Sequence, residues 1–188
     1  MGGRVRISAR AARAASSSAK GVEVATRDWV EKFVVRLKLC PFAKTAMEQH
    51  VVMRVCEGNE RDALKMIEET CDGLAEWEGK GGFTGATGFV VTPGLFDDFL
   101  GYMRFMNEDV THMLEEKQFV GTLQIAQFHP MFMFEGNDAD DAYNTVNRSP
   151  YPMFHILREE EVTRADEVMD TATIWARNEK LLRRLGRR

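Results

Sequence analysis

Four side chains in this sequence have the chemistry of a catalytic site: Cys40, His129, Arg148 and His155. Each lies in a predicted loop or at the end of a predicted element, next to a proline or a turn, where rigid scaffolds present reactive groups. A thiol acts as a nucleophile when a histidine accepts its proton, and an arginine can bind an anion. If the fold brings the four together, they predict a small enzyme acting on an anionic small molecule.

Cys40 is the candidate nucleophile, because the segment LKLCPFAK places it just past a predicted helix end. That end of a helix favours cations and would raise the pKa of the thiol. Cys40 therefore needs His129, His155 or Arg148 nearby to become a reactive thiolate. With a histidine as general base, a Cys–His pair could catalyse acyl or sulfur transfer.

The segment NRSPYPMFH, residues 147–155, predicts a helix that begins at Pro152. Proline disfavours helical geometry at the preceding Tyr151, and it suits the first helical position, where no N–H donor is needed. Ser149 or Asn147 would supply capping oxygens. A helix N-terminus flanked by Arg148 and His155 would be an anion site.

Arg158 would lie one turn beyond His155 on the same helical face. The predicted substrate-binding residues are Arg148, Asn147, Ser149, Tyr151 and Arg158. An equally weighted alternative is purely structural: Arg148 pairs with an acidic residue of the preceding loop, and His155 caps or packs.

The same thiol and histidines could instead bind a metal. The spacings among Cys40, His129 and His155 are 89 and 26 residues, and they match no standard zinc motif. A glycine-rich segment, residues 79–85, matches neither common phosphate-binding pattern and is expected to be a connector. The sequence identifies no cofactor.

Alternating helical and strand patterns predict one α/β domain. The expected helices cover residues 26–38, 59–78, 94–117 and 163–185, and the expected strands cover 51–56, 86–93 and 119–130. A fourth strand could lie in 131–136. We therefore expect a three- or four-stranded sheet covered by helices, either a ferredoxin-like sandwich or an open α/β layer.

His129 and Pro130 directly follow the third predicted strand, and VTPG, residues 91–94, ends the second. In open α/β sheets the carboxyl ends of strands line the ligand crevice, so both segments are expected at the same edge. The loop over 131–147 carries four acidic residues and no clear periodicity. Loops of this length are often functional.

The N-terminal region differs in composition from the rest of the chain. Residues 1–20 contain five basic and no acidic residues, which leaves 20 basic and 29 acidic residues in the remainder. This composition is typical of an organelle transit peptide. We expect a disordered extension over 1–22, a single domain over 23–188, and a location in the mitochondrion or a plastid.

Composition also excludes several function classes. An acidic body lacks the clustered basic residues that nucleic-acid binding needs, and no apolar run is long enough to span a membrane. Three cysteines without a CxxC pair or a secretory signal do not predict a disulfide framework.

Three segments together resemble the signature of an uncharacterised family, domain of unknown function 1415: LKLCPFAK, LQIAQFHP and NRSPYPMFHILRE. The resemblance covers about residues 26–165. It implies these signature positions: Cys40, Pro41, His129, Pro130, Asn147, Arg148, Ser149, Pro150, Tyr151, Pro152, His155 and Arg158. It implies no activity, but it favours a shared site over four local packing solutions.

A non-catalytic role is the main alternative to an enzyme. The methionine- and phenylalanine-rich region over 94–134 could bind a protein partner, as in an organellar binding or assembly subunit. That hypothesis requires a contiguous exposed apolar patch.

Overall fold

The computed structural model describes residues 18–48, 50–76, 86–168 and 170–186. Its centre is a four-stranded mixed sheet in the order β1-β2-β4-β3. The strands are β1 (Val51–Val55), β2 (Thr87–Val91), β3 (Leu123–Phe128) and β4 (Met153–Arg158). β1 and β2 are parallel, whereas β4 is antiparallel to both of its neighbours. The carboxyl ends of β1, β2 and β3 therefore lie at one edge of the sheet, as expected for the segments that follow β2 and β3.

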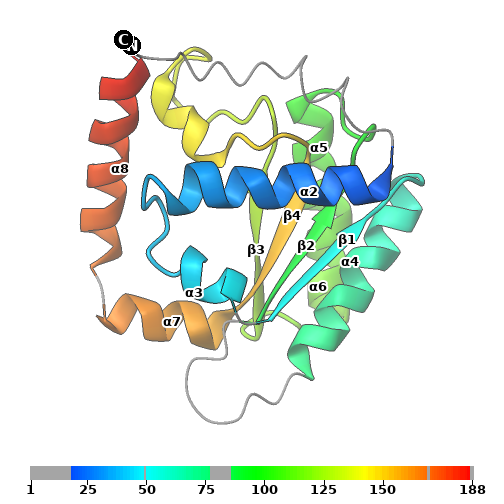
Figure 1. The fold of residues 1–188 in the computed structure, drawn as a ribbon. Helices are drawn as coiled ribbons and strands as arrows, with labels where there is room; N and C mark the ends of the chain where they lie inside the picture. Colours follow the sequence, from blue (N-terminus) through cyan, green and yellow to red (C-terminus); the bar gives the residue numbers. More distant parts are fainter. Residues whose placement is uncertain (1–17, 49, 77–85, 169, 187–188) are drawn as a thin grey trace.

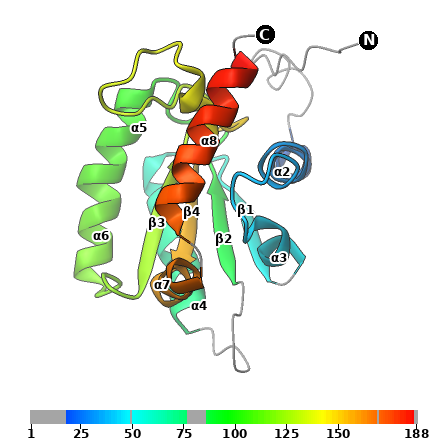
Figure 2. The ribbon, with the colours of Figure 1, turned by 90° about the vertical axis from the view of Figure 1, so that its left-hand side faces the viewer.

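Helices cover both faces of the sheet, as Figure 1 and Figure 2 show. α2 (Ala19–Trp29), η1 (Val30–Val35) and α3 (Ala43–Glu48) lie on one face. α4 (Glu60–Ala75), α5 (Phe99–Phe105), η2 (Met106–Val110) and α6 (Thr111–Glu116) lie on the other. This three-layer arrangement is the open α/β layer and excludes the ferredoxin-like sandwich, which leaves one sheet face without helices.

Each face of the sheet has its own apolar core. The core under α2 and η1 includes Val22, Trp29, Phe89, Val91 and Met153. The core under α4, α5 and η2 includes Ile67, Leu74, Val90, Phe154 and Ile156. Along β2 and β4, successive side chains enter opposite cores, so these central strands are buried on both faces.

The first helix is longer than predicted. Ser18 accepts a hydrogen bond from the backbone N–H of Gly21 as the N-cap, and the helix continues through α2 and a π-helical turn, η1. The predicted cap, Thr26, lies inside the helix and donates to the carbonyl of Val22 at 2.9 Å. The transit-peptide prediction was made on residues 1–20, of which 1–17 lie outside the described residues, as does the predicted connector over 79–85. Residues 18–22, which were assigned to the extension, form the N-cap and the start of α2.

Residues 94–98 were predicted to open the long helix, but they form a turn instead. Gly94 and Phe96 both have positive φ, at 86° and 57°, a backbone geometry that cannot belong to an α-helix. The helix begins only at Phe99, where the Asp98 side chain caps the N–H of Gly101 at 2.8 Å. α5, η2 and α6 then continue as one helical rod behind the sheet (Figure 1).

The predicted helix from Pro152 is wrong, because this segment forms the central strand β4. Its run of apolar residues is compatible with a short helix or a doubly buried strand, and periodicity alone does not separate the two. The predicted strand in 131–136 is also wrong, because those residues belong to a loop that ends in the 3-10 helix η3 (Ala142–Asn147). The fourth strand is therefore present, but about twenty residues later than expected.

Two helices close the chain where one was predicted. α7 (Glu159–Val168) follows β4 directly, and α8 (Thr171–Gly186) lies against the β3 side of the sheet, beside η3 (Figures 1 and 2). Among the described residues, no helix is both long and apolar enough to span a bilayer.

Candidate functional site

Cys40 lies in the turn between η1 and α3 and is exposed, whereas Cys56 and Cys71 are buried. The preceding helix ends at Lys38, whose φ of 55° is left-handed. The N–H of Leu39 donates to the carbonyl of Val34 at 2.9 Å, and the N–H of Lys38 donates to that of Val35 at 3.0 Å. This pair of bonds is a Schellman motif, which fixes the direction in which the chain leaves the helix.

Two opposing effects act on the Cys40 thiol. Surrounding protein atoms raise its pKa, and the backbone N–H groups of Phe42 and Ala43, directed at the sulfur, lower it in part. The desolvation effect is the larger one, so the free protein carries a thiol at neutral pH. The two N–H groups would nevertheless stabilise negative charge that develops on the sulfur during a reaction.

The C-terminal helix α8 holds the chain immediately before Cys40. Asn178 is buried, and its amide Nδ2 donates to the Leu39 carbonyl at 2.7 Å. The Arg177 guanidinium donates to the carbonyls of Leu37 and Lys38, each at 3.0 Å. These contacts satisfy three carbonyls at a helix C-terminus, where a cation is also favourable.

His129 is buried at the carboxyl edge of β3 and serves as a structural link. The N–H of Met131 donates to its Nδ1 at 3.0 Å, so the ring carries its proton on Nε2 and donates to the Phe96 carbonyl at 2.8 Å. Desolvation lowers the pKa of His129. The histidine thereby ties the turn after β2, including the strained Phe96, to the end of β3.

His155 lies in the middle of β4 and faces the α2 side of the sheet. Its Nε2 is 2.6 Å from Thr87 Oγ1, and its ring stacks on Phe89 with centroids 4.1 Å apart. Burial of the ring lowers its pKa to about 3. An efficient general base has a pKa near the working pH, so His155 in this state is poorly suited to that role.

Arg148 does not flank a helix N-terminus as predicted. Its guanidinium instead bonds two carbonyls of the long loop that precedes it. Its Nε donates to the Phe132 carbonyl at 2.9 Å, and its Nη2 donates to the Ala139 carbonyl at 2.6 Å. Desolvation lowers the pKa of this guanidinium. No ion pair of Arg148 with an acidic residue occurs in the described parts of the chain, so the structural alternative of a loop-acid partner fails.

The other predicted binding residues have mainly backbone partners. Asn147 donates from Nδ2 to the Gln127 carbonyl at 3.2 Å, and Ser149 donates to the Tyr151 carbonyl at 2.5 Å. Tyr151 is buried in the core on the α2 side. Arg158 ends β4 at the opposite edge of the sheet from Arg148. Its Nη2 lies 3.9 Å from Oε2 of Glu160.

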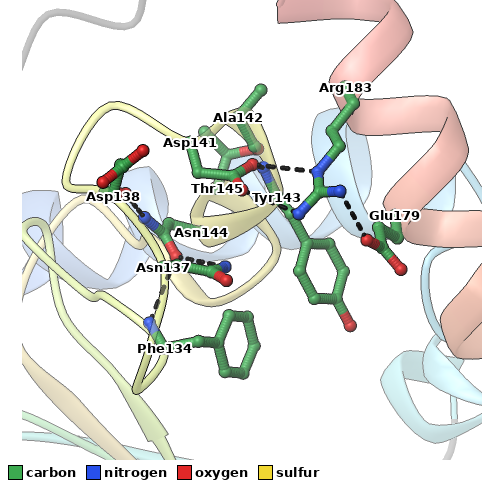
Figure 3. A network of polar contacts seen from close by, with 10 residues as sticks. All are labelled: Phe134, Asn137, Asp138, Asp141, Ala142, Tyr143, Asn144, Thr145, Glu179 and Arg183. Atoms are coloured by element: carbon green, nitrogen blue, oxygen red, sulfur yellow. Dashed lines mark hydrogen bonds and ion pairs between the residues drawn. The ribbon is translucent and has the colours of Figure 1, made fainter.

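The loop before η3 is also bound to α8, as Figure 3 shows. Asn144 is buried and accepts hydrogen bonds from the N–H of Phe134 and the amide of Asn137. Arg183 of α8 reaches Asp141 with two hydrogen bonds, of 2.8 and 3.2 Å, and pairs with Glu179 at 2.7 Å. The Arg183 guanidinium lowers the pKa of Asp141.

The structure brings together only part of the predicted set. His129 and Asn147 meet at the carboxyl edge of the sheet, where the backbone N–H of His129 donates to the Asn147 carbonyl at 3.2 Å, and Arg148 is the next residue along the chain. The side chains of Cys40 and His155 contact other partners, and no hydrogen bond joins Cys40 to His129 or His155. A Cys–His catalytic pair therefore stays a prediction.

The metal-binding alternative loses support. The described residues contain no group of three or more His, Cys, Asp or Glu side chains that could hold a metal ion, so the site predicted from Cys40, His129 and His155 is not formed. In the methionine- and phenylalanine-rich region over 94–134, Phe105, Met106 and Met113 are buried, whereas Leu100, Met131 and Met133 are exposed. The hypothesis that this region binds a protein partner stays a prediction.

Sequence reasoning missed Arg177, Asn178 and Thr87. A buried asparagine that bonds a carbonyl 139 residues away leaves no local pattern in the sequence. Thr87 lies in a recognised strand, but its role follows from the pairing of β2 with β4, which was not predicted.

The fold and the site can be compared with known proteins. No curated protein and no solved structure matches the chain. One family model matches residues 21–188, nearly the whole described region, and its description reads "Protein of unknown function (DUF1415)". The resemblance of the three signature segments is thus confirmed over a longer range, and the chain belongs to the DUF1415 family.

Proposed function

We propose that this protein is a small thiol-dependent enzyme that acts on an anionic small molecule, with Cys40 as its nucleophile. The observation that carries the proposal is the setting of Cys40. It is the exposed cysteine, and the backbone N–H groups of Phe42 and Ala43 are directed at its sulfur.

The charges around this turn support an anionic substrate. Lys38 and Lys44 are exposed on either side of Cys40 in the sequence, and Lys44 Nζ lies 3.9 Å from a carboxylate oxygen of Glu48. Arg177 bonds the carbonyls just upstream, and it has no carboxylate partner among the described residues. Excess positive charge near a reactive thiol attracts an anionic substrate and lowers the cost of forming a thiolate.

In the proposed step, the sulfur of Cys40 forms a bond to an electrophilic carbon of the substrate with its own electron pair. The thiol proton leaves to solvent, and the leaving group departs with the electrons of the bond that breaks. Phe42 and Ala43 stabilise the charge on the sulfur as its proton is lost. The ring of His155 is not assigned the role of base, because its low pKa makes it a weak proton acceptor.

Protection of Cys40 by small anions tests the proposal. The native protein is treated with iodoacetamide, and modification of Cys40 is followed by peptide mass spectrometry in inorganic phosphate, in acetate, or in chloride of equal ionic strength. A neutral cysteine peptide in the same tube is the control. We expect phosphate or acetate to slow the alkylation of Cys40 but not of the peptide, because a bound anion would cover the thiol. Equal rates of Cys40 alkylation in all three salts would contradict an anion site at this turn.

A further inference from the structure

We propose that Asn178 and Arg177 of α8 are positioning residues for the Cys40 thiol, so that the C-terminal helix is part of the reactive site. This inference rests on the proposed function. It adds a distant element that the signature segments, which end at 158–159, do not include.

The first support is the number of contacts directed at one short segment. Arg177 and Asn178 take the carbonyls of Leu37, Lys38 and Leu39, the three residues that immediately precede Cys40. These carbonyls belong to the end of a helix and have no intrahelical donor. Two adjacent residues of α8 therefore hold the short segment that connects the end of the first helix, α2 and η1, to Cys40.

The second support is that the two side chains are oriented by each other. Arg177 Nη1 donates to Asn178 Oδ1 at 2.9 Å, which leaves the Asn178 Nδ2 to face the Leu39 carbonyl. The amide orientation is thereby determined by the network. Because Asn178 is 3% exposed, water does not readily replace its bond to Leu39.

The anchored residue Leu39 directly precedes the thiol, so a change in its position would affect Cys40. Cys40 is the next residue after Leu39, and its own carbonyl accepts the N–H of Ala43 at 3.3 Å. Leu39 is the anchored end of the turn that directs the N–H groups of Phe42 and Ala43 at the sulfur. Release of the Leu39 carbonyl would let this turn move, and the N–H groups would no longer be held on the sulfur.

The test is the dependence of the Cys40 alkylation rate on pH, measured with iodoacetamide in the full-length protein. The variants are Asn178→Ala, Arg177→Gln and Arg177→Lys. Arg184→Gln is the control for charge, because Arg184 is exposed on the same helix. Arg183→Gln is the control for docking of α8, because Arg183 binds Asp141 and not the Cys40 turn.

For Asn178→Ala and Arg177→Gln we expect the rate near pH 8 to fall about threefold to tenfold, the effect of losing about one hydrogen bond, and the profile to move to higher pH. Arg177→Lys should recover part of the loss, and both control variants should match the wild type. Circular dichroism identifies folded variants. If Asn178→Ala does not fold, the comparison of Arg177→Gln with Arg177→Lys tests the inference.

Two outcomes would overturn the inference. One is an unchanged profile in Arg177→Gln and Asn178→Ala, and the other is a rate that rises equally at all pH values, which indicates better access alone. Either outcome leaves the proposed function intact, because that depends on the wild-type thiol. Absence of anion protection in the wild type would instead refute the proposed function itself.

Discussion

The best-defined titratable contact at the residue scale joins Thr87 and His155 across β2 and β4. Thr87 Oγ1 donates to the Ile156 carbonyl at 3.0 Å, which uses the single hydroxyl hydrogen. His155 must then donate from Nε2 to the same oxygen, at 2.6 Å. Because burial lowers the pKa of the ring to about 3, the ring is neutral at pH 7 with its proton on Nε2, and it stacks on Phe89.

This neutral histidine predicts lower stability in acid. Its pKa is about 3 when folded and near the ordinary value of 6.5 when unfolded. The unfolded chain therefore binds a proton as pH falls below 6.5, and the stability given by the neutral ring is lost down to the folded pKa. Between pH 7 and pH 4.5 we expect the wild type to lose about 2–3 kcal/mol more unfolding free energy than His155→Gln, which cannot titrate.

Urea unfolding at the two pH values measures this difference. Glutamine keeps a donor for Thr87, and His129 is present in both proteins, so its contribution cancels in the comparison. An equal loss in the two proteins would show that the ring of His155 is not held neutral by the fold.

His129 illustrates how a plausible catalytic residue can be structural. Both of its ring nitrogens are engaged with backbone groups, those of Phe96 and Met131. The position was predictable, because it follows from the end of the third strand. Its role was not predictable, because Phe96 reaches it only through the left-handed turn over residues 92–98.

At the element scale, the helix that precedes Cys40 ends at a residue in an unfavourable conformation. Lys38 has a φ of 55° at the position of a Schellman motif where glycine is common. Both of its backbone groups are engaged: the N–H donates to the Val35 carbonyl, and the carbonyl accepts from Arg177. The lysine side chain is exposed, and the hydrogen bonds that end the helix are made by backbone atoms of Lys38.

Lys38→Gly should therefore stabilise the protein by about 0.5–1 kcal/mol, because glycine adopts this conformation without a Cβ penalty. Thermal or urea unfolding would measure the gain, with Lys180→Gly in the interior of α8 as a matched control that should destabilise by a similar amount. A loss of stability in Lys38→Gly would mean that the left-handed geometry at this helix end is wrong.

β4 shows where reading the sequence fails and why. Pro152, the apolar run after it and the absence of a turn signal fit a short helix as well as a strand. Pairing with β2 on one side and β3 on the other decides in favour of the strand. By contrast, β1, β2 and β3 were predictable, because turn signals bound each of them, and their carboxyl ends lie at one edge as expected.

At the scale of the whole molecule, α8 connects regions that are distant in the sequence. Arg183 binds Asp141 in the loop before η3, and Gly186 lies so close to the first residue of η3 that an added Cβ would be 2.5 Å from the Cβ of Ala142. Arg177 and Asn178 bind the turn before Cys40. One helix thus holds both the loop closed by Arg148 and the turn that presents the thiol (Figures 1 and 3).

The sequence predicted which residue types the candidate site contains, but not which residues contact one another there. Cys40 was recognised from its position at a helix end, and the structure places it in such a turn. The partners of that turn, Arg177 and Asn178, approach from the opposite end of the chain, and no local pattern reports such a contact. The expected meeting of the thiol with a histidine depended on an arrangement that short-range patterns do not determine.

The central claim is that Cys40 is a thiol in a setting that attracts anions, and its relative reactivity toward iodoacetate and iodoacetamide tests this most directly. The two reagents alkylate by the same chemistry and differ in charge. For Cys40 in the wild-type protein, we expect a higher ratio of iodoacetate to iodoacetamide rates than for a neutral cysteine peptide. The ratio should approach that of the peptide as added salt screens Lys38, Lys44 and Arg177. A ratio at or below that of the peptide in low salt would contradict the claim.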